Sequence, residues 1–398
     1  MSEYQLIKMK YNFDEILDRR GTSSVKWDGV SANWNGRTDL LPMWVADMDF
    51  RTPPFVIDAL RKRLEHEVIG YTFACDEWYE AIMKWVKMRF DWDVKREMIT
   101  YSPGIVHGIT FAILCFTQPG DKVMVTPPVY HPFFLMTERN HREVVWSPLV
   151  LSDGQYHIDF DRFRRDVKGC KLFILSNPHN PGGRVWTKEE LQKIAEICAE
   201  NGTLIISDEI HADLTLPPYK HHTFAKVSET ALHHSLTFMA PSKAFNMPGL
   251  SSSYCIVEDD KIREQFFTYL NNSEWNEGHF LACIGAAAAY SHGLDWLNQV
   301  LAYIKANVEY LDKYLKENIP AIKAIIPQAS YLVFLDCRDM HLSQERLCSF
   351  FEDGAHLALN SGTTFGKEGE GFMRLNVGCP RATLQKALTQ LKEAYDKL

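Results

Sequence analysis

Short apolar runs alternate with longer amphipathic stretches through the middle of the chain. Runs of this length, rich in Val, Ile, Leu and Phe, are typical of strands buried on both faces of a sheet. We therefore expect a buried sheet at the centre of the fold. Its predicted strands cover residues 121–126, 142–149, 171–177, 203–208, 235–240 and 253–257.

One amphipathic stretch, residues 187–202, lies between the third and fourth predicted strands. Its apolar residues recur three and four positions apart, as on one face of a helix. Thr187 and Glu190 fit the capping box that begins a helix, and Gly202 fits the residue that ends one. Alternation of strands with helices is typical of an α/β fold with a mainly parallel sheet. The sequence therefore predicts this fold class for the larger part of the chain.

The pattern changes from about residue 291 onward, where long helices predominate over short strands. We expect a large domain over residues 46–290 and a smaller α+β domain over 291–398. Residues 1–45 show no strong pattern and are expected to pack against one or both domains. Two helices are predicted in the smaller domain, over residues 297–319 and 381–398.

Composition excludes several classes of function. With 43 basic and 51 acidic residues the net charge is −8, which disfavours nucleic acid as a partner. The chain starts without a signal-like apolar segment, and its longest nearly apolar run, residues 280–290, is too short to span a bilayer. The nine cysteines are odd in number and show no CxxC spacing. We expect a cytoplasmic protein with reduced cysteines, no membrane anchor and no metal site.

Polar residues gather at the ends of three predicted strands, where open parallel sheets bind their ligands. Asn177 and Asn180 follow the third strand, Asp208 and Glu209 close the fourth, and Lys243 follows the fifth. Each has an ordinary alternative: a Pro-rich turn for the asparagines, a cap or ion pair for the acids, and a solvated loop for the lysine. In an apolar site, however, the pKa of a lysine falls and its amine becomes a nucleophile.

Three further features extend this set. Residues 102–104 precede a predicted helix that begins near Val106, and the free N–H groups of a helix start favour a phosphate. Tyr130 follows another strand and could stack on a planar ring, unless it is a core tyrosine. Arg374 lies in an apolar setting and needs a carboxylate, from the protein or from a ligand. Taken together, the set meets the needs of pyridoxal 5'-phosphate (PLP) bound to an amino acid.

Four segments resemble the class I/II aminotransferase superfamily, fold type I of the PLP enzymes. They read SNPHNPGGRVW, SDEIHADL, APSKAFNMPGL and FMRLNVGCPRATL, in this order along the chain. Two N-terminal segments, FDEILDRRGTSSVKWD and PMWVADMDF, resemble more narrowly the MalY/PatB group of cystathionine β-lyases. The resemblance covers nearly the whole chain.

The resemblance implies a role for individual residues. Lys243 would carry the cofactor covalently, Asp208 would pair with the pyridine nitrogen, and Tyr130 would stack on the ring. Asn180 would contact both the ring O3′ and the substrate. Further implied contacts to the phosphate are the N–H groups of Ile105 and Val106, the Ser242 hydroxyl, and Tyr71 of a neighbouring subunit, which implies a homodimer. Tyr71 would join Lys243 and Asp208 as a catalytic residue, and Arg374 and Ala46 would bind the substrate.

Two positions depart from the superfamily pattern. His211 stands where many aminotransferases have a tyrosine that contacts O3′, and Ser251 stands where many have an arginine on the phosphate. The histidine agrees with the lyase group. We keep it among the candidate cofactor-binding residues, although a hydrogen-bonded histidine without a role in proton transfer is the preferred interpretation. The serine leaves the exact phosphate ligands open.

The resemblance implies a PLP-dependent carbon–sulfur β-lyase. It would cleave L-cystathionine or a related cysteine S-conjugate to a thiol, pyruvate and ammonia. The same residues would also serve an aminotransferase, and a PLP-binding module with a regulatory role is a third class. The sequence leaves the preferred sulfur amino acid open.

Overall fold

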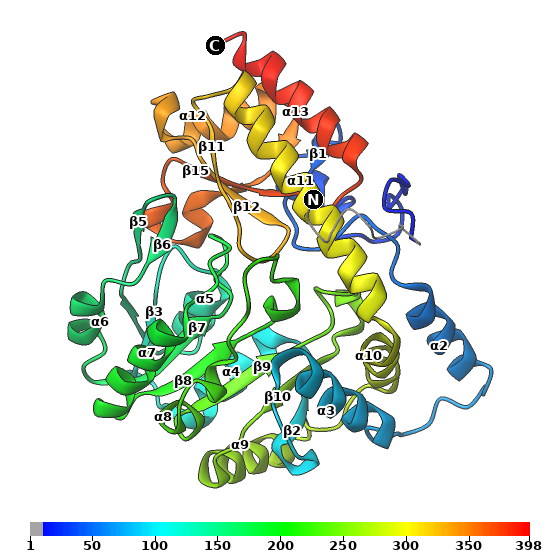
Figure 1. The fold of residues 1–398 in the computed structure, drawn as a ribbon, viewed down its shortest axis with the longest axis vertical. Coiled ribbons are helices and arrows are strands. Elements are labelled where there is room, and N and C mark those ends of the chain that lie inside the picture. The colour runs from blue at the N-terminus through cyan, green and yellow to red at the C-terminus, as the bar shows by residue number, and fades with distance from the viewer. Residues whose placement is uncertain (1–10) are drawn as a thin grey trace.

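The computed structural model describes residues 11–398, so residues 1–10 of the expected N-terminal segment lie outside the described residues. A seven-stranded sheet forms the centre of the fold, in the order β2-β10-β9-β8-β7-β3-β4 (Figure 1). Only β10 runs antiparallel to its neighbours. The strands are β2 (Ile99–Ser102), β3 (Lys122–Val125), β4 (Glu143–Trp146), β7 (Cys170–Ser176), β8 (Leu204–Asp208), β9 (Ser235–Met239) and β10 (Ser253–Ile256).

The predicted α/β class with a mainly parallel sheet is confirmed. Six of the seven strands correspond to the predicted apolar runs. The exception is β2, which pairs only with β10 at the edge of the sheet and has four residues. Its pattern, Ile-Thr-Tyr-Ser, is too short for the period of a strand to be recognised.

Alternate residues of the strands point to opposite faces of the sheet, and each face has its own helical cover. Leu172 and Ile174 of β7 belong to a core cluster with α4 (Ile105–Phe116) and α9 (Asp260–Asn272). Phe173 and Leu175 belong to the opposite cluster. That second cluster includes α6 (Phe160–Asp166) and α7 (Lys188–Glu200). Because both faces are covered, β7, β8 and β9 read as continuous apolar runs.

The boundaries of α7 confirm its predicted capping residues. The backbone N–H of Glu190 donates to the Thr187 hydroxyl over 3.2 Å, and the Thr187 N–H donates to the Glu190 carboxylate over 2.8 Å. Gly202 has a φ of +64°, which glycine adopts without strain.

A second, antiparallel sheet forms in the C-terminal part of the chain, in the order β11-β12-β15-β14 (Figure 1). Its strands are β11 (Lys323–Ile325), β12 (Leu332–Asp336), β14 (Asn360–Ser361) and β15 (Phe372–Asn376). The two predicted long helices are present as α11 (Leu294–Asn318) and α13 (Arg381–Tyr395). The expected domain limits at 45 and 290 stay predictions.

The described N-terminal segment contacts the C-terminal part of the molecule. Its strand β1 (Leu41–Pro42) pairs in parallel with β13 (Leu357–Ala358). Phe13 packs against Trp296 and Tyr303 of α11. Other elements complete the fold: α1 (Gly29–Asn33), α2 (Pro54–Leu64), α3 (Asp76–Phe90), α5 (Pro132–Arg139), β5 (Val150–Ser152), β6 (Gln155–His157), α8 (Glu229–Leu232), α10 (Phe280–His292) and α12 (Gln344–Ser349).

None of the helices within residues 11–398 is both long and apolar enough to cross a bilayer. All nine cysteines are free.

Candidate active site

A cavity of about 250 Å³ lies where β7, β8 and β9 end at their carboxyl termini. The topology explains its position, because the residues that follow parallel strands meet at one edge of the sheet. The cavity brings together most of the residues that the sequence singled out. The sequence-predicted residues in its wall are Ala46, Ile105, Val106, Tyr130, Asn180, Asp208, His211, Ser242 and Lys243.

The Lys243 side chain is half-buried in the loop that follows β9. Its Nζ donates a hydrogen bond of 2.6 Å to the backbone carbonyl of Ala46. Burial lowers the pKa of this amine to about 8, because the charged form loses its hydration. The positive charge of Arg374 lowers the pKa further, while Asp47 and Asp208 raise it. A large fraction of the amine is therefore neutral and nucleophilic near pH 8.

The Asp208 carboxyl is buried at the end of β8. Burial raises its pKa to about 7, against a single stabilising backbone hydrogen bond of 3.0 Å from Ile210. Among residues 11–398 it forms no ion pair. A carboxyl in this state is poised to accept a cationic ligand group, which would lower its pKa again.

Arg374 is buried behind Asn180. Its Nη1 donates to Asn180 Oδ1 over 3.1 Å, and its Nη2 donates to Asn360 Oδ1 over 2.7 Å and to the Trp44 carbonyl over 3.1 Å. Nε has no hydrogen-bond partner within the described part of the chain. Burial lowers the pKa of the guanidinium to about 10, so it is still a cation at neutral pH. A buried cation held only by neutral acceptors favours an anionic ligand such as a carboxylate.

The N-terminus of α4 forms another wall of the cavity. Gly104 precedes the helix with a φ of +130°, and no side chain caps the first turn. The N–H groups of Ile105 and Val106 have no partner within the helix, because the first turn of any α-helix leaves them free. Ser242, Ser251 and Ser253 lie in the same wall and add hydroxyl groups. This combination of free N–H groups and hydroxyls suits a phosphate.

Two ring side chains line the cavity. Tyr130 presents its ring to it, and burial raises the pKa of its hydroxyl. Burial lowers the pKa of His211 to about 3, so the imidazole is neutral at physiological pH. The His211 Nδ1 is buried and has no hydrogen-bond partner among residues 11–398. The interpretation of His211 as a hydrogen-bonded histidine without a role in proton transfer stays a prediction.

Tyr71 lies away from the cavity of its own chain. It belongs to the connection between α2 and α3, which extends at the edge of the molecule (Figure 1), and its side chain is fully exposed. Its catalytic and phosphate-binding roles stay predictions. Asn177 and Glu209 do not line the cavity either. The Asn177 amide donates to Glu209, which also accepts from His221 over 2.6 Å.

Sequence reasoning missed two residues that hold parts of the site from outside the cavity wall. Asn360 holds Arg374, and Tyr331 donates to the same Ala46 carbonyl as Lys243, over 2.9 Å. Neither residue belongs to a recognisable motif, and both come from the C-terminal sheet region. No signal in the sequence would have placed Asn360 beside Arg374 or Tyr331 beside Ala46.

The residues present fit PLP. The Lys243 amine suits covalent attachment of an aldehyde, the unpaired Asp208 suits a pyridinium, and the start of α4 suits a phosphate. The unpartnered Nδ1 of His211 and Nε of Arg374 mark two positions where a ligand group would complete the hydrogen bonding. Within the described residues, no cluster of His, Cys, Asp and Glu side chains could hold a metal ion.

Comparisons with known proteins agree with this geometry. The protein is 43% identical over 385 residues to the cystathionine beta-lyase PatB of Bacillus subtilis (strain 168), covering 96% of this chain and 99% of that protein. It is 32% identical over 390 residues to protein MalY of Escherichia coli (strain K12), covering 96% and 98% of the two chains. The crystal structure of cystalysin from Treponema denticola, which contains a PLP cofactor, superposes with a TM-score of 0.94 at 33% identity, covering 98% of this chain and 100% of that one.

The family model for aminotransferase class I and II matches residues 38–391, which include every candidate residue of the cavity. The chain therefore belongs to the class I and II aminotransferase family.

Proposed function

We propose that the protein is a PLP-dependent carbon–sulfur β-lyase that acts on L-cystathionine or a related cysteine S-conjugate. The observation that carries this proposal is one cavity lined by the Lys243 amine and by the Asp208 carboxyl, which forms no ion pair among residues 11–398, with the Arg374 guanidinium directly behind Asn180 of the cavity wall. The relatives support the lyase over the transferase, because PatB is named a cystathionine beta-lyase.

Each of the three residues has a distinct task in this reaction. Bound PLP supplies an electron sink for the electron pair of the Cα–H bond. The Arg374 guanidinium binds the α-carboxylate and so orients the Cα–H bond. The Lys243 amine removes that proton as a general base, and its lowered pKa provides the neutral form that this step needs. The Asp208 carboxylate stabilises positive charge on the ring nitrogen.

The overall reaction is a β-elimination followed by hydrolysis. The Cα–H and Cβ–S bonds break, and the sulfur leaves as a thiol. Water then releases the remaining three carbons as pyruvate and the nitrogen as ammonia. L-Cystathionine would give homocysteine, pyruvate and ammonia.

We further infer that the active unit is a homodimer. The connection that carries Tyr71 exposes three other large apolar side chains, Val68, Ile69 and Phe73, each more than 60% exposed. A contiguous apolar segment of this kind is unfavourable in water and favours burial against a partner. A second copy of the chain would cover it and receive Tyr71 near its phosphate site.

The test uses purified protein with PLP and L-cystathionine and no 2-oxo acid. Equimolar release of pyruvate and free thiol over many turnovers is the expected result. Amino transfer that appears only after a 2-oxo acid is supplied would replace the proposal by an aminotransferase. Bound PLP with neither activity would favour a regulatory module.

A Lys243→Ala variant is the matched control for this test. It should lose turnover and the absorption band of covalently bound PLP. Full activity of the variant would contradict the role assigned to the amine.

A further inference from the structure

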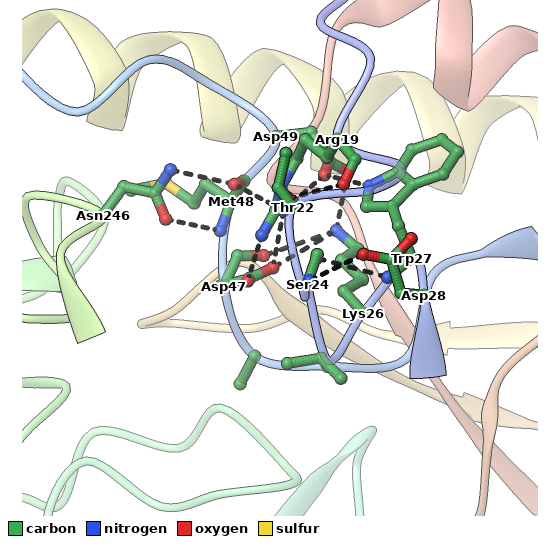
Figure 2. Close-up of polar contacts among 12 residues, drawn as sticks. Arg19, Thr22, Ser24, Lys26, Trp27, Asp28, Asp47, Met48, Asp49 and Asn246 are labelled. Atoms are coloured by element: carbon green, nitrogen blue, oxygen red, sulfur yellow. Dashed lines mark hydrogen bonds and ion pairs between the residues drawn. The ribbon is translucent and has the colours of Figure 1, made fainter. Parts of the chain in front are cut away.

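A cluster of four charged side chains lies next to the cavity; two of them, Lys26 and Asp49, are buried, and the other two are half-buried. We call it the N-terminal charge cluster; it consists of Arg19, Lys26, Asp47 and Asp49 (Figure 2). Arg19 forms a two-pronged pair with Asp47, with distances of 2.6 and 3.0 Å, and donates to Asp49 over 2.8 Å. Lys26, only 1% exposed, donates to Asp49 over 2.7 Å.

Stability is a weak reason for such a cluster. Burying an ion costs several kcal/mol, as for Lys26 and Asp49 here, and the attraction between the partners often only offsets that cost. An ion-pair cluster of this kind contributes more clearly to the position of the backbone that carries it. The backbone in question is residues 44–50, which carry both aspartates.

Five consecutive carbonyls of this segment accept hydrogen bonds from side chains. This pattern fixes an irregular segment as firmly as a strand pairing would. The acceptors and donors are Trp44 with Arg374, Val45 with Asn376, Ala46 with Lys243 and Tyr331, Asp47 with Asn376, and Met48 with Asn246 and Arg19.

Two of these contacts tie the segment directly to the Lys243 loop. The Ala46 carbonyl accepts from Lys243 Nζ. Asn246, three residues after the lysine, accepts from the Met48 N–H over 2.9 Å and donates to the Met48 carbonyl over 2.9 Å (Figure 2). Asp47 of the N-terminal charge cluster is therefore the next residue after Ala46, whose carbonyl accepts the hydrogen bond from the Lys243 amine.

The N-terminal charge cluster also acts on the Lys243 amine electrostatically, through Asp47. Besides burial, the groups that act on Lys243 are Asp47, Arg374 and Asp208, and the neutral His211 faces it as well. Asp47 is the largest of the charged influences, and it favours the protonated amine. Its carboxylate is already paired with Arg19, which offsets part of that negative charge.

We propose that the Arg19–Asp47 ion pair is a positioning element for the Lys243 amine. It holds the Ala46 carbonyl against that amine and balances the negative charge that Asp47 presents to it. Asp49 accepts hydrogen bonds from both Arg19 and Lys26 and so fixes the Arg19 side of the pair. This inference rests on the proposed function, in which Lys243 carries the cofactor.

The test compares two variants that break the same ion pair. Arg19→Met leaves Asp47 with only the longer 3.9 Å pair to Lys26, so the nitrogen of Lys243 should titrate at a pH higher by about one unit. Asp47→Asn removes the carboxylate that favours the protonated amine and leaves Arg19 paired with Asp49 alone, so the titration should move to lower pH by about the same amount. The readout is the pH dependence of the absorption of Lys243-bound PLP. If the substitutions only loosened residues 44–50, the titration midpoint would shift in the same direction in both variants.

Two controls accompany these variants. Arg19→Lys retains the positive charge and should titrate close to the wild type. Arg51→Met breaks the exposed 2.6 Å ion pair between Arg51 and Glu15, which lies just beyond residues 44–50. This variant should leave the titration unchanged. Equal titration midpoints in Arg19→Met, Asp47→Asn and the wild type would overturn the inference.

The same shifts can be read without cofactor, which separates this inference from the proposed function. In PLP-free protein, the pH dependence of Lys243 acylation, followed by mass spectrometry, should show the same opposite shifts. A wild type without any band from bound PLP would contradict the proposed function. If the acylation of Lys243 still shifted to higher pH in Arg19→Met and to lower pH in Asp47→Asn, the positioning role would be supported. Shifts of the same sign and size in the two variants would contradict it.

Discussion

Three ionisable groups in or next to the cavity lack the charged partners that would ordinarily compensate the loss of hydration. Among residues 11–398, Asp208 forms no ion pair, and every hydrogen-bond acceptor of Arg374 is a neutral group. The Lys243 amine donates its hydrogen bond to a backbone carbonyl. Each costs free energy in the isolated protein. Groups with such perturbed pKa values concentrate at functional sites, where a ligand supplies the missing partner.

The perturbed Lys243 predicts a pH-dependent cost to stability. The pKa of its amine is about 8 in the folded protein and 10.5 ordinarily, so the unfolded chain binds more protons between these values. Stability therefore rises with pH across this range. In PLP-free protein, Lys243→Met should increase the free energy of unfolding over the wild type below pH 8. That advantage should shrink by about 3 kcal/mol towards pH 10.5. Urea unfolding at several pH values measures it, and a pH-independent difference would contradict the lowered pKa.

Arg374 makes a prediction about substrate binding. A hydrogen bond to a charged group contributes about 1.5–3 kcal/mol, so Arg374→Ala should raise the KM for L-cystathionine roughly 10- to 100-fold. The kcat should fall less than the KM rises. Arg338→Ala, which removes an exposed arginine paired with Asp336 near the end of the same sheet, is the matched control and should leave both unchanged. An unaltered KM in Arg374→Ala would remove the residue from the carboxylate site.

At the scale of elements, the start of α4 predicts how the phosphate site responds to a change in the backbone. Gly104 has a φ of +130° and a ψ of +152°, a region that is essentially limited to glycine, and an added Cβ would lie 3.2 Å from His107 Nδ1. Gly104→Ala should therefore shift the first turn and weaken PLP binding. A strained conformation of this kind costs about 1–3 kcal/mol.

The control for this prediction is Gly120→Ala. Gly120 also has a positive φ, of +88°, but an added Cβ would meet no atom within 4 Å. Both variants should lose stability in thermal unfolding, whereas only Gly104→Ala should weaken the binding of PLP in an absorption titration. Equal PLP affinities in the two variants would show that the start of α4 does not hold the phosphate.

The sequence predicted elements well where their signal is local. The strands β7, β8 and β9 are buried on both faces, so each is a continuous apolar run, and Thr187 and Glu190 mark the start of α7 within four residues. The polar residues that follow these strands were predicted to meet, and Asn180, Asp208 and Lys243 do line one cavity. The edge strand β2 was missed because its four residues have no comparable pattern.

At the scale of the whole molecule, the sequence could not predict contacts between distant segments. The Ala46 carbonyl and the Lys243 amine are 197 residues apart, and Arg374 and Trp44 are 330 apart. No periodicity or capping pattern encodes such pairs. For the same reason residues 1–45 showed no strong pattern, although Arg19 and Lys26 pair with aspartates close to the Ala46 carbonyl that accepts from Lys243. Residues held by tertiary contacts alone become visible only in the folded chain.

The proposed homodimer makes the last prediction. If Tyr71 enters the neighbouring subunit, each site takes Lys243 from one chain and Tyr71 from the other. Tyr71→Phe and Lys243→Ala homodimers should then both be nearly inactive. A hybrid of the two, isolated through two different affinity tags, should recover about half the wild-type activity per dimer, because one of its two sites is intact. A hybrid of wild type and Lys243→Ala is the control and should also show about half. If the hybrid of the two variants were inactive while the control hybrid was active, Tyr71 would act in the site of its own chain. A protein that is fully monomeric in sedimentation would exclude a shared site altogether.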